Sequence, residues 1–234
     1  MNKAIVLSSG GVDSTTCVGI AVERLGKENV TTVSIYYGQK HSKELECADK
    51  IARYYGVDHK VIDLSKTGIM DDSNCPLLQQ STEQIPEQSY AEQIEKNGEG
   101  MVTTYVPFRN GLMLASIAAF AMSKYPNDEV AIYLGAHADD AAGDAYADCS
   151  PEFVHFMGCA IHKGTYGKVT VLSPLVYMNK AQVVKTGLRL KVPYELTWSC
   201  YNGGDRPCGK CGTCIDRANA FAANGVEDPA LKEN

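Results

Sequence analysis

Two hydrophobic periodicities alternate at the start of the chain. Three short runs rich in β-branched and aromatic residues predict strands, at residues 3–8, 30–37 and 59–64, and the first of them is expected to be buried. Between them, residues 13–25 and 45–55 carry apolar side chains on one face of a helix, and Gly56 ends the second stretch. Strand, helix, strand, helix, strand is the order of a parallel sheet covered by helices on both faces. The fold class is therefore α/β, with a doubly wound parallel sheet.

The pattern lapses and then returns. Residues 65–100 are polar, and we expect a structureless loop there, either a mobile flap over a site or a plain surface insertion. Residues 112–122 are apolar all round, which predicts a helix that its neighbours bury on every side. The remaining expected elements are a strand at 130–134 and helices at 151–163 and 178–191.

Composition and charge exclude several classes of protein. The 234 residues suit one medium domain, or one domain with a small appendage. A composition of 44% hydrophobic and 21% charged residues excludes a largely disordered chain. The longest apolar stretch is too short to cross a bilayer. Polar residues and glycines interrupt the apolar run near the N-terminus, so we expect that it is not a secretory leader. We therefore expect a cytoplasmic protein without a membrane partner. The net charge of -6 repels nucleic acid unless a local basic patch exists.

A glycine turn follows the first expected strand and precedes the first expected helix. Consecutive glycines let the backbone approach an anion, and a helix N-terminus offers free N–H groups and a positive dipole end. The turn lacks the lysine of the Gly-Lys-Ser/Thr nucleotide loop and is not G-x-G-x-x-G. It predicts a phosphate site, with a tight turn capped by Asp13 or Ser14 as the alternative. The residues expected to bind phosphate are Ser8, Ser9, Gly10, Gly11, Val12, Asp13, Ser14 and Thr15.

Four of the nine cysteines crowd near the C-terminus with spacing C-x7-C-x2-C-x2-C, at Cys200, Cys208, Cys211 and Cys214. Four thiolates at short spacing are typical of closed tetrahedral structural zinc. A four-iron cluster is the first alternative and four unrelated thiols the second, but nothing else in the chain indicates redox chemistry. We expect residues 1–195 to form a nucleotide-binding domain and residues 196–234 a cysteine-rich zinc module packed on it.

The string SGGVDST resembles the pyrophosphate loop of the ATP pyrophosphatases, a family that includes GMP synthetase, NAD synthetase and tRNA-modifying ligases. Together with the cysteine spacing, residues 104–110 (TYVPFRN) and 146–153 (YADCSPEF) make nearly the whole chain resemble the 7-cyano-7-deazaguanine synthases. Ala147 and Ser150 depart from that family's usual proline and arginine, and the stretch at 139–145 is longer than in many members. These departures leave the fine specificity for the acceptor open.

The resemblance implies a ligase that converts 7-carboxy-7-deazaguanine and ammonia to 7-cyano-7-deazaguanine through adenylated intermediates, as a homodimer that binds no nucleic acid directly. It implies ATP and Mg²⁺ as well as Zn²⁺, because Asp13 beside a phosphate makes sense only with a cation between them. Free ammonia is the expected donor, since no second domain could release it from glutamine. The implied catalytic residues are Asp13, Ser14 and Arg109, and the implied acceptor residues are Arg109, Asn110, His137, Asp148, Glu152 and Phe153.

Simpler roles exist for several of these residues. Arg109 could pair with a carboxylate, Asp148 could cap the helix that follows Pro151, and His137 could be a satisfied loop histidine. Cys149 is better explained as a buried thiol than as a nucleophile, because no partner base is evident.

Two rival functions remain at this point. A tRNA-thiolating ligase would need a basic surface. The chain has one cluster of basic residues, at Lys180, Lys185, Arg189 and Lys191. Such a cluster is more often a solvated helix face than a binding surface. A zinc-stabilised nucleotide sensor without turnover would need only the binding loop.

Overall fold

A parallel sheet forms the centre of the protein, of which this computed structural model describes residues 1–98 and 100–231. Its strands, in the order β3-β2-β1-β4-β5 across the sheet, are β1 (Lys3–Leu7), β2 (Val30–Tyr36), β3 (Asp58–Asp63), β4 (Val130–Tyr133) and β5 (Val169–Leu172). In the register, Ala4 lies opposite Val30 of β2 and Ala131 of β4. The predicted doubly wound α/β fold is confirmed.

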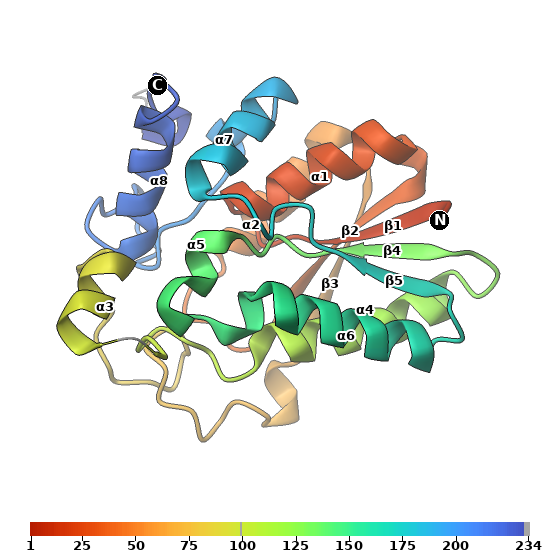
Figure 1. The fold of residues 1–234 in the computed structure, drawn as a ribbon, viewed down its shortest axis with the longest axis horizontal. Coiled ribbons are helices and arrows are strands. Elements are labelled where there is room, and N and C mark those ends of the chain that lie inside the picture. Colours follow the sequence, from red (N-terminus) through yellow and green to blue (C-terminus); the bar gives the residue numbers. More distant parts are fainter. Residues whose placement is uncertain (99, 232–234) are drawn as a thin grey trace.

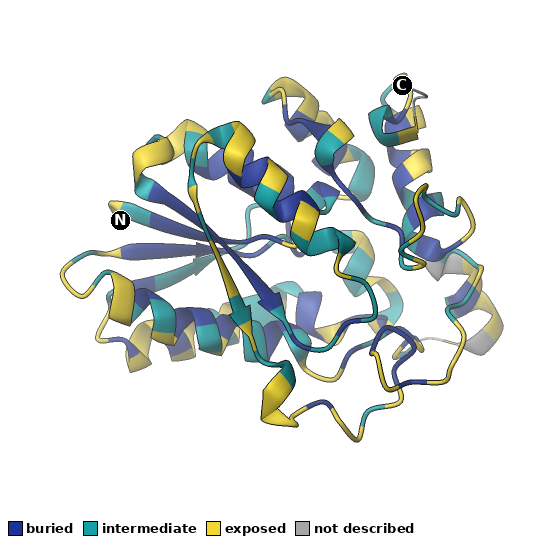
Figure 2. Ribbon diagram, turned by 180° about the vertical axis from the view of Figure 1, so that it is seen from behind, coloured by how far each residue is buried: buried dark blue, intermediate teal, exposed yellow. Residues whose placement is uncertain are grey.

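Helices cover both faces of this sheet (Figure 1). The helices of the described residues, on the sheet and beyond it, are α1 (Val12–Leu25), α2 (Lys43–Tyr55), α3 (Tyr90–Asn97), α4 (Arg109–Lys124), α5 (Ala138–Ala141), α6 (Pro151–Gly164), α7 (Lys180–Arg189) and α8 (Gly212–Ala222). Alternate residues of β1 enter different cores: Ile5 packs with Leu114 and Ile117 of α4, whereas Val6 packs with Val18 of α1 and Val183 of α7. Figure 2 shows the central strands buried between the two helical layers, whereas the edge strand β3 is largely exposed. Among the described residues, no helix has the length and apolarity that a membrane crossing requires.

The predicted strands and helices appear within a few residues of their expected bounds. The strand β5 was missed, because its run of four residues is short and only Val169 is fully buried. The helix at 112–122 is present within α4, but burial on every side is wrong, since Ala115 and Ala119 are exposed. Its apolar surface packs on the sheet on one side only.

The segment at 65–100 is not the structureless loop that its polarity predicts. It contains α3, which begins at a capping box: the Ser89 hydroxyl accepts a hydrogen bond from the Glu92 amide, and the Glu92 carboxylate accepts one from the Ser89 amide. Earlier in the segment, Met70, Leu77 and Leu78 are buried in the same core as α4. Helix and core contacts therefore order a stretch whose composition predicts a loop.

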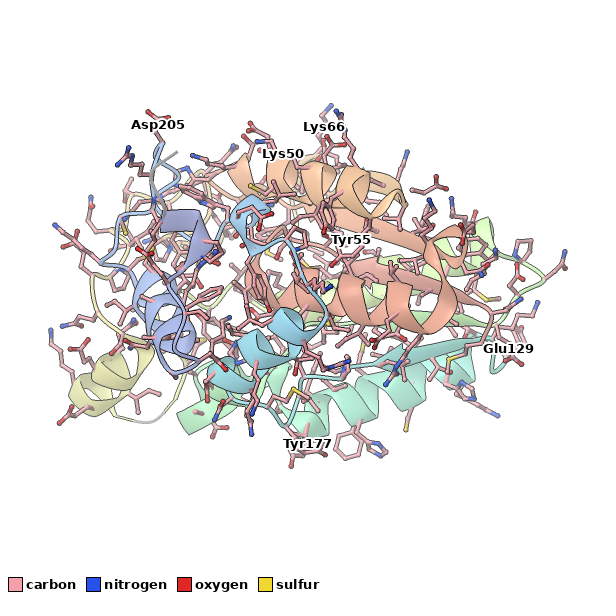
Figure 3. The ribbon with its side chains drawn as sticks, turned by 90° about the horizontal axis from the view of Figure 1, so that it is seen from above. Lys50, Tyr55, Lys66, Glu129, Tyr177 and Asp205 are labelled. Carbon is pink, nitrogen blue, oxygen red and sulfur yellow. The ribbon has the colours of Figure 1, made fainter. Side chains whose placement is uncertain are left out.

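The residues after 196 pack closely on the N-terminal part of the chain. The Trp198 amide donates to the Gly10 carbonyl at 2.9 Å. Lys43 Nζ of α2 lies 3.8 Å from the centre of the Trp198 ring and donates to the carbonyl of Asp205, which lies at the outer edge of the molecule (Figure 3). Within the segment, Arg217 and Asp228 form an ion pair at 2.6 Å, with side chains 5% and 4% exposed. Contacts on both sides thus hold the C-terminal segment against the first strand end.

Candidate functional site

The glycine loop lies where β1 ends, between its two neighbours β2 and β4, which is the position where open α/β sheets bind ligands. Gly10 has φ +79°, and a Cβ at this position would collide with the Glu44 carbonyl and with the Ala48 amide of α2. Gly11 is the N-cap of α1, and no side chain caps the helix. The first N–H groups of α1 therefore remain available to an anion, and the capped-turn alternative is wrong.

The eight residues of the loop divide into two sets. A cavity of about 230 Å³ is lined by Ser8, Ser9, Gly11, Asp13 and Ser14. The Ser8 hydroxyl is buried and has no hydrogen-bond partner among the described residues. The other three lie behind this surface: Gly10 against α2, Val12 in the core, and Thr15 with its hydroxyl donating to the Gly11 carbonyl at 2.6 Å. A serine hydroxyl without a partner and the free N–H groups of a helix N-terminus are hydrogen-bond donors, and phosphate oxygens accept hydrogen bonds from such donors.

Asp13 is paired inside the protein with a residue 167 positions away. Lys180 Nζ, at the start of α7, lies 2.6 and 2.8 Å from its two carboxylate oxygens. Burial by itself would raise the pKa of Asp13, but Lys180 and His137 hold it below its usual value. The expectation that Lys180 belongs to a solvated helix face is therefore wrong, because its side chain is 17% exposed. No local sequence pattern distinguishes this lysine from the other basic residues of α7.

His137 is not the satisfied loop histidine of the simpler interpretation. Its Nε2 lies 3.2 Å from Lys180 Nζ and 3.3 Å from Asp140 Oδ2, while its buried Nδ1 has no partner among the described residues. Burial raises the pKa of Asp140, although His137 and Lys180 oppose the shift. Burial also raises the pKa of Asp216, in α8, to about 6, and Lys180 again opposes the shift. The sequence analysis missed both of these carboxylates.

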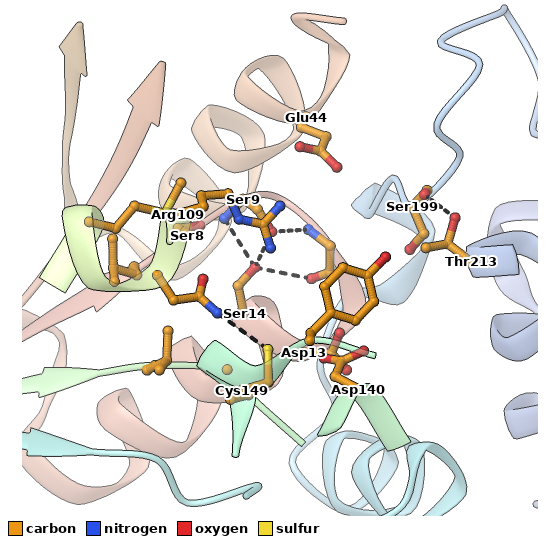
Figure 4. A pocket seen from close by; sticks show the side chains of 18 of the residues that line it. Ser8, Ser9, Asp13, Ser14, Glu44, Arg109, Asp140, Cys149, Ser199 and Thr213 are labelled. Carbon is orange, nitrogen blue, oxygen red and sulfur yellow. Dashed lines mark hydrogen bonds between the residues drawn. The ribbon is translucent and has the colours of Figure 1, made fainter. Parts of the chain in front are cut away.

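Arg109 enters the same cavity from the first turn of α4 (Figure 4). Its Nη1 lies 3.5 Å from the Tyr37 hydroxyl, and it makes no ion pair with a carboxylate among the described residues. Next to it, Asn110 donates from its side chain to the Asp148 carbonyl at 3.0 Å and to the Cys149 sulfur at 3.2 Å. Because Arg109 has no carboxylate partner in the described part of the chain, its guanidinium is available to an anionic ligand.

Three predicted acceptor residues do not line the cavity. The Asp148 carboxylate accepts a hydrogen bond from the Asn110 amide at 2.9 Å, so it supports α4. The suggestion that it caps the helix after Pro151 is wrong, because Ser150 caps α6. Glu152 is exposed, and Phe153 packs edge-on against Phe108 with ring centres 5.8 Å apart. Among the predicted acceptor residues, the structure brings Arg109, Asn110 and His137 together.

The four clustered cysteines form a compact group. Their sulfur atoms all lie within 4.8 Å of one another, and the Cys208 and Cys214 sulfurs are 4.0 Å apart. A single zinc ion at about 2.3 Å from each sulfur places tetrahedral ligands about 3.8 Å apart. The Lys210 and Cys211 amides donate to the Cys208 sulfur, which orients it. This donor set fits one structural zinc ion, and the larger four-iron cluster would hold its cysteines farther apart.

The cysteine segment also contributes to the wall of the cavity. Several of its residues line it, namely Trp198, Ser199, Tyr201, Thr213 and Asp216. The Thr213 hydroxyl donates to the Ser199 carbonyl at 2.7 Å, which joins the start of α8 to the strand of chain before Cys200. The segment that carries the four cysteines and the glycine loop therefore line the same cavity.

A five-stranded parallel sheet covered by helices on both faces, with a glycine loop at the end of its central strand, defines a doubly wound α/β protein. Two solved structures share the fold. They are the NH3-dependent NAD synthetase of Campylobacter jejuni (13% identity, 83% of this chain and 66% of that chain, TM-score 0.51) and the NMN synthetase of Francisella tularensis (13%, 97% and 78%, TM-score 0.52). At this identity the likeness shows the fold alone.

The family follows from the sequence comparisons. The family model described as "Queuosine biosynthesis protein QueC" matches residues 3–225, and the chain belongs to this family. It is 40% identical over 232 residues to the 7-cyano-7-deazaguanine synthase of Archaeoglobus fulgidus (99% of this chain, 90% of the relative). It is 41% identical over 231 residues to that of Pseudoalteromonas atlantica (98% of each). The resemblance deduced from the motifs is confirmed.

Proposed function

We propose that this protein is an ATP-dependent ligase of queuosine biosynthesis that makes 7-cyano-7-deazaguanine from 7-carboxy-7-deazaguanine and ammonia. Membership of the QueC family over residues 3–225 carries this conclusion. The cavity supports it, because an anion-binding loop and an unpaired guanidinium face the same space.

The chemistry explains why such a site is needed. A carboxylate is a poor electrophile, since its leaving group would be oxide. Transfer of AMP from ATP to the carboxylate releases pyrophosphate, and ammonia then displaces AMP to give the amide. A second AMP transfer, to the amide oxygen, allows loss of AMP and of two protons to give the nitrile. The protein has to align the reactants, neutralise phosphate charge and exclude water from the acyl adenylate.

The loop and its distant partners suit the phosphate end of this reaction. Ser8, Ser9 and Ser14 offer hydroxyl groups, and the start of α1 offers backbone N–H groups, to the β- and γ-phosphates. We assign Lys180, which lines the same cavity and pairs with Asp13, to the leaving pyrophosphate. Mg²⁺ fits beside Asp13 and Asp140, where it would neutralise phosphate charge.

At the acceptor end of the reaction we assign Arg109 to the carboxylate of the substrate. Asn110 lines the same cavity beside it and holds the cavity wall together, because its side-chain N–H groups donate to the Asp148 carbonyl and the Cys149 sulfur. Burial raises the pKa of Cys149 well above its usual value, with Asp140 and Asp148 adding to the shift. A thiol held protonated in this way does not act as a nucleophile. Ammonia rather than a cysteine is therefore the group that attacks the adenylate.

We also propose a homodimer in the cytoplasm, where reduced cysteines can hold zinc. Helix α6 is rich in apolar residues, yet Phe156 is 70% exposed, and Tyr177 is 82% exposed at the rim of the molecule (Figure 3). Exposed aromatic side chains of this kind are typical of surfaces that meet another protein. Light scattering on the purified protein would measure the mass of the assembly.

Nucleic acid is not expected as a partner. Of the basic cluster, Lys180 is used inside the site and Arg189 pairs with Glu23 at 3.2 Å, so it offers no continuous basic face.

The direct test is formation of AMP and nitrile from the deazaguanine acid, ATP and an ammonium salt, with ATP–pyrophosphate exchange as the partial reaction. A tRNA-thiolating ligase would need tRNA for turnover, and a nucleotide sensor would show no exchange. Either result would overturn the assignment.

A further inference from the structure

The cavity contains two opposite charges that are not paired with each other. Glu44, in the first turn of α2, lines the cavity, and its carboxylate has no hydrogen bond or ion pair among the described residues. Arg109 lines the same cavity from α4, and its bond to Tyr37 leaves the guanidinium without a carboxylate. Figure 4 shows the two side chains in this pocket, on different elements. A ligand with hydrogen-bond donors at one end and an anion at the other would satisfy both.

The unpaired carboxylate is costly for the free protein. Burial raises the pKa of Glu44 to about 7, and Arg109 opposes the shift only in part. Glu44 is also held in place, because its backbone carbonyl packs against Gly10 of the phosphate loop. A half-buried carboxylate that faces a cavity without a hydrogen-bond partner among the described residues, on backbone packed against the glycine loop, indicates a group that a ligand completes.

We propose that the Glu44 carboxylate binds the guanine-like edge of the acceptor, while Arg109 binds the carboxylate at the acceptor's other end. This inference rests on the proposed function. The edge of a 7-deazaguanine presents two adjacent donors, the ring N–H and the exocyclic amino group, and a carboxylate accepts both. The pair of contacts fixes which end of the acceptor faces ATP.

The same geometry distinguishes the acceptor from the adenine of ATP. An adenine edge presents one donor beside one acceptor, so it matches an amide or a neutral carboxylic acid better than it matches a carboxylate. Glu44 therefore selects the guanine-like base by charge as well as by shape. A base that lacks the amino group would leave one carboxylate oxygen without its donor.

The test uses the full-length protein and the variant Glu44→Gln, with Glu46→Gln as the matched control, since Glu46 is exposed on the same helix. We expect Glu44→Gln to raise the KM for 7-carboxy-7-deazaguanine about 100-fold, with the KM for ATP unchanged, because a charged hydrogen-bond pair is lost. Glu46→Gln should leave both values unchanged. Glu44→Asp keeps the charge but shortens the side chain, and it should recover part of the affinity.

A substrate analogue without the exocyclic amino group, 7-carboxy-7-deazahypoxanthine, separates recognition from folding. The native protein should use it far less well than the natural acceptor, whereas Glu44→Gln should show little preference between the two. An unchanged KM for the acceptor, an equal preference in both proteins, or a change confined to the KM for ATP would each overturn the assignment of Glu44. Absence of nitrile formation by the native protein would instead overturn the proposed function.

Discussion

The phosphate loop and the cysteine group are both short, glycine-containing segments, but they are held in different ways. The four cysteines lie within fifteen positions of the chain, so neighbouring residues supply all the ligands. The loop depends on distant elements: α2 packs behind Gly10, Trp198 binds the Gly10 carbonyl, and Lys180 binds Asp13. Neighbouring residues are enough to assemble the cysteine group, whereas the surroundings of the glycine loop need the whole fold.

The two regions are nevertheless not independent. The segment that carries the cysteines also supplies Trp198, Ser199 and Asp216 to the cavity, so its order is a condition for the site. A change in the cysteine segment is therefore expected to affect activity at the glycine loop as well as local stability.

Loss of the metal should have the largest effect. Structural zinc contributes on the order of 10 kcal/mol to local folding, which is comparable to the net stability of a domain. Without it, residues 198–216 should unfold, and activity should disappear with them because they line the cavity. We expect Cys211→Ser to lower zinc content, melting temperature and activity together, whereas Cys159→Ser, an exposed thiol of α6, should change none of them.

Elemental analysis of the native protein should find about one zinc ion per chain and no iron. A zinc-free protein of full stability, or a brown protein with iron absorption, would contradict the metal assignment. Full activity in a metal-free protein would show that the two regions are independent after all.

The second effect concerns the loop itself. Asp13→Ala should lower AMP formation at least about 1000-fold, roughly 4 kcal/mol in the barrier, because the carboxylate that positions Lys180 and a cation is gone. The fold should survive, since the change removes a side chain at the cavity surface. Glu23→Ala, at the far end of α1, is the matched control and should keep normal activity. Normal AMP formation by Asp13→Ala would remove the loop assignment.

A smaller effect on stability should follow from Glu44. Its pKa is raised from 4.5 to about 7 in the folded protein, so ionising it costs more in the folded state than in the unfolded state. The contribution of Glu44 therefore lowers the free energy of unfolding as pH rises from 4.5 to about 7. Above about pH 7 this loss of stability is complete. We expect Glu44→Gln to be more stable than the ligand-free native protein at pH 8 by on the order of 2 kcal/mol, and equally stable near pH 4.

Denaturant unfolding at the two pH values would measure this difference. Glu46→Gln, exposed on the same helix, should show no such gain at pH 8. Equal stabilities at both pH values would mean that Glu44 is paired or solvated in the free protein.

The smallest effect is expected in the segment at 65–100. Its end is joined to the cavity wall, because the Gly100 amide donates to Gly143 and the Val102 amide donates to Ala145, next to Tyr146 of the wall. Limited trypsin digestion should cut after the exposed Lys96, several-fold more slowly with ATP and acceptor bound. Cleavage after the exposed Lys27, which lies between α1 and β2 and outside this segment, is the internal control. If ligands leave cleavage after Lys96 unchanged, the segment is a surface insertion and no lid.

Much of the fold and two parts of the site could be predicted from the sequence, because their signals are local. Hydrophobic periodicity over five to fifteen residues identified four of the strands and most of the longer helices. The loop at residues 8–15 and the four cysteines were found because each chemistry needs particular residue types a few positions apart. The same reasoning failed for β5, which has four residues and depends on pairing with β4, and for α3, whose polar composition hides its capping box.

Only the tertiary structure decided which side chains surround the loop. Lys180 reaches Asp13 across 167 positions, and Glu44 meets Arg109 in one cavity only because β2 and β4 lie on either side of β1. Asp140 and Asp216 likewise come from segments that no local pattern connects. The order of strands in a sheet determines which strand ends meet, and that order depends on how separate hydrophobic faces are buried together. The sequence by itself therefore identified the glycine loop and the four clustered cysteines, while the fold alone assembled the charged side chains that surround the loop in the cavity.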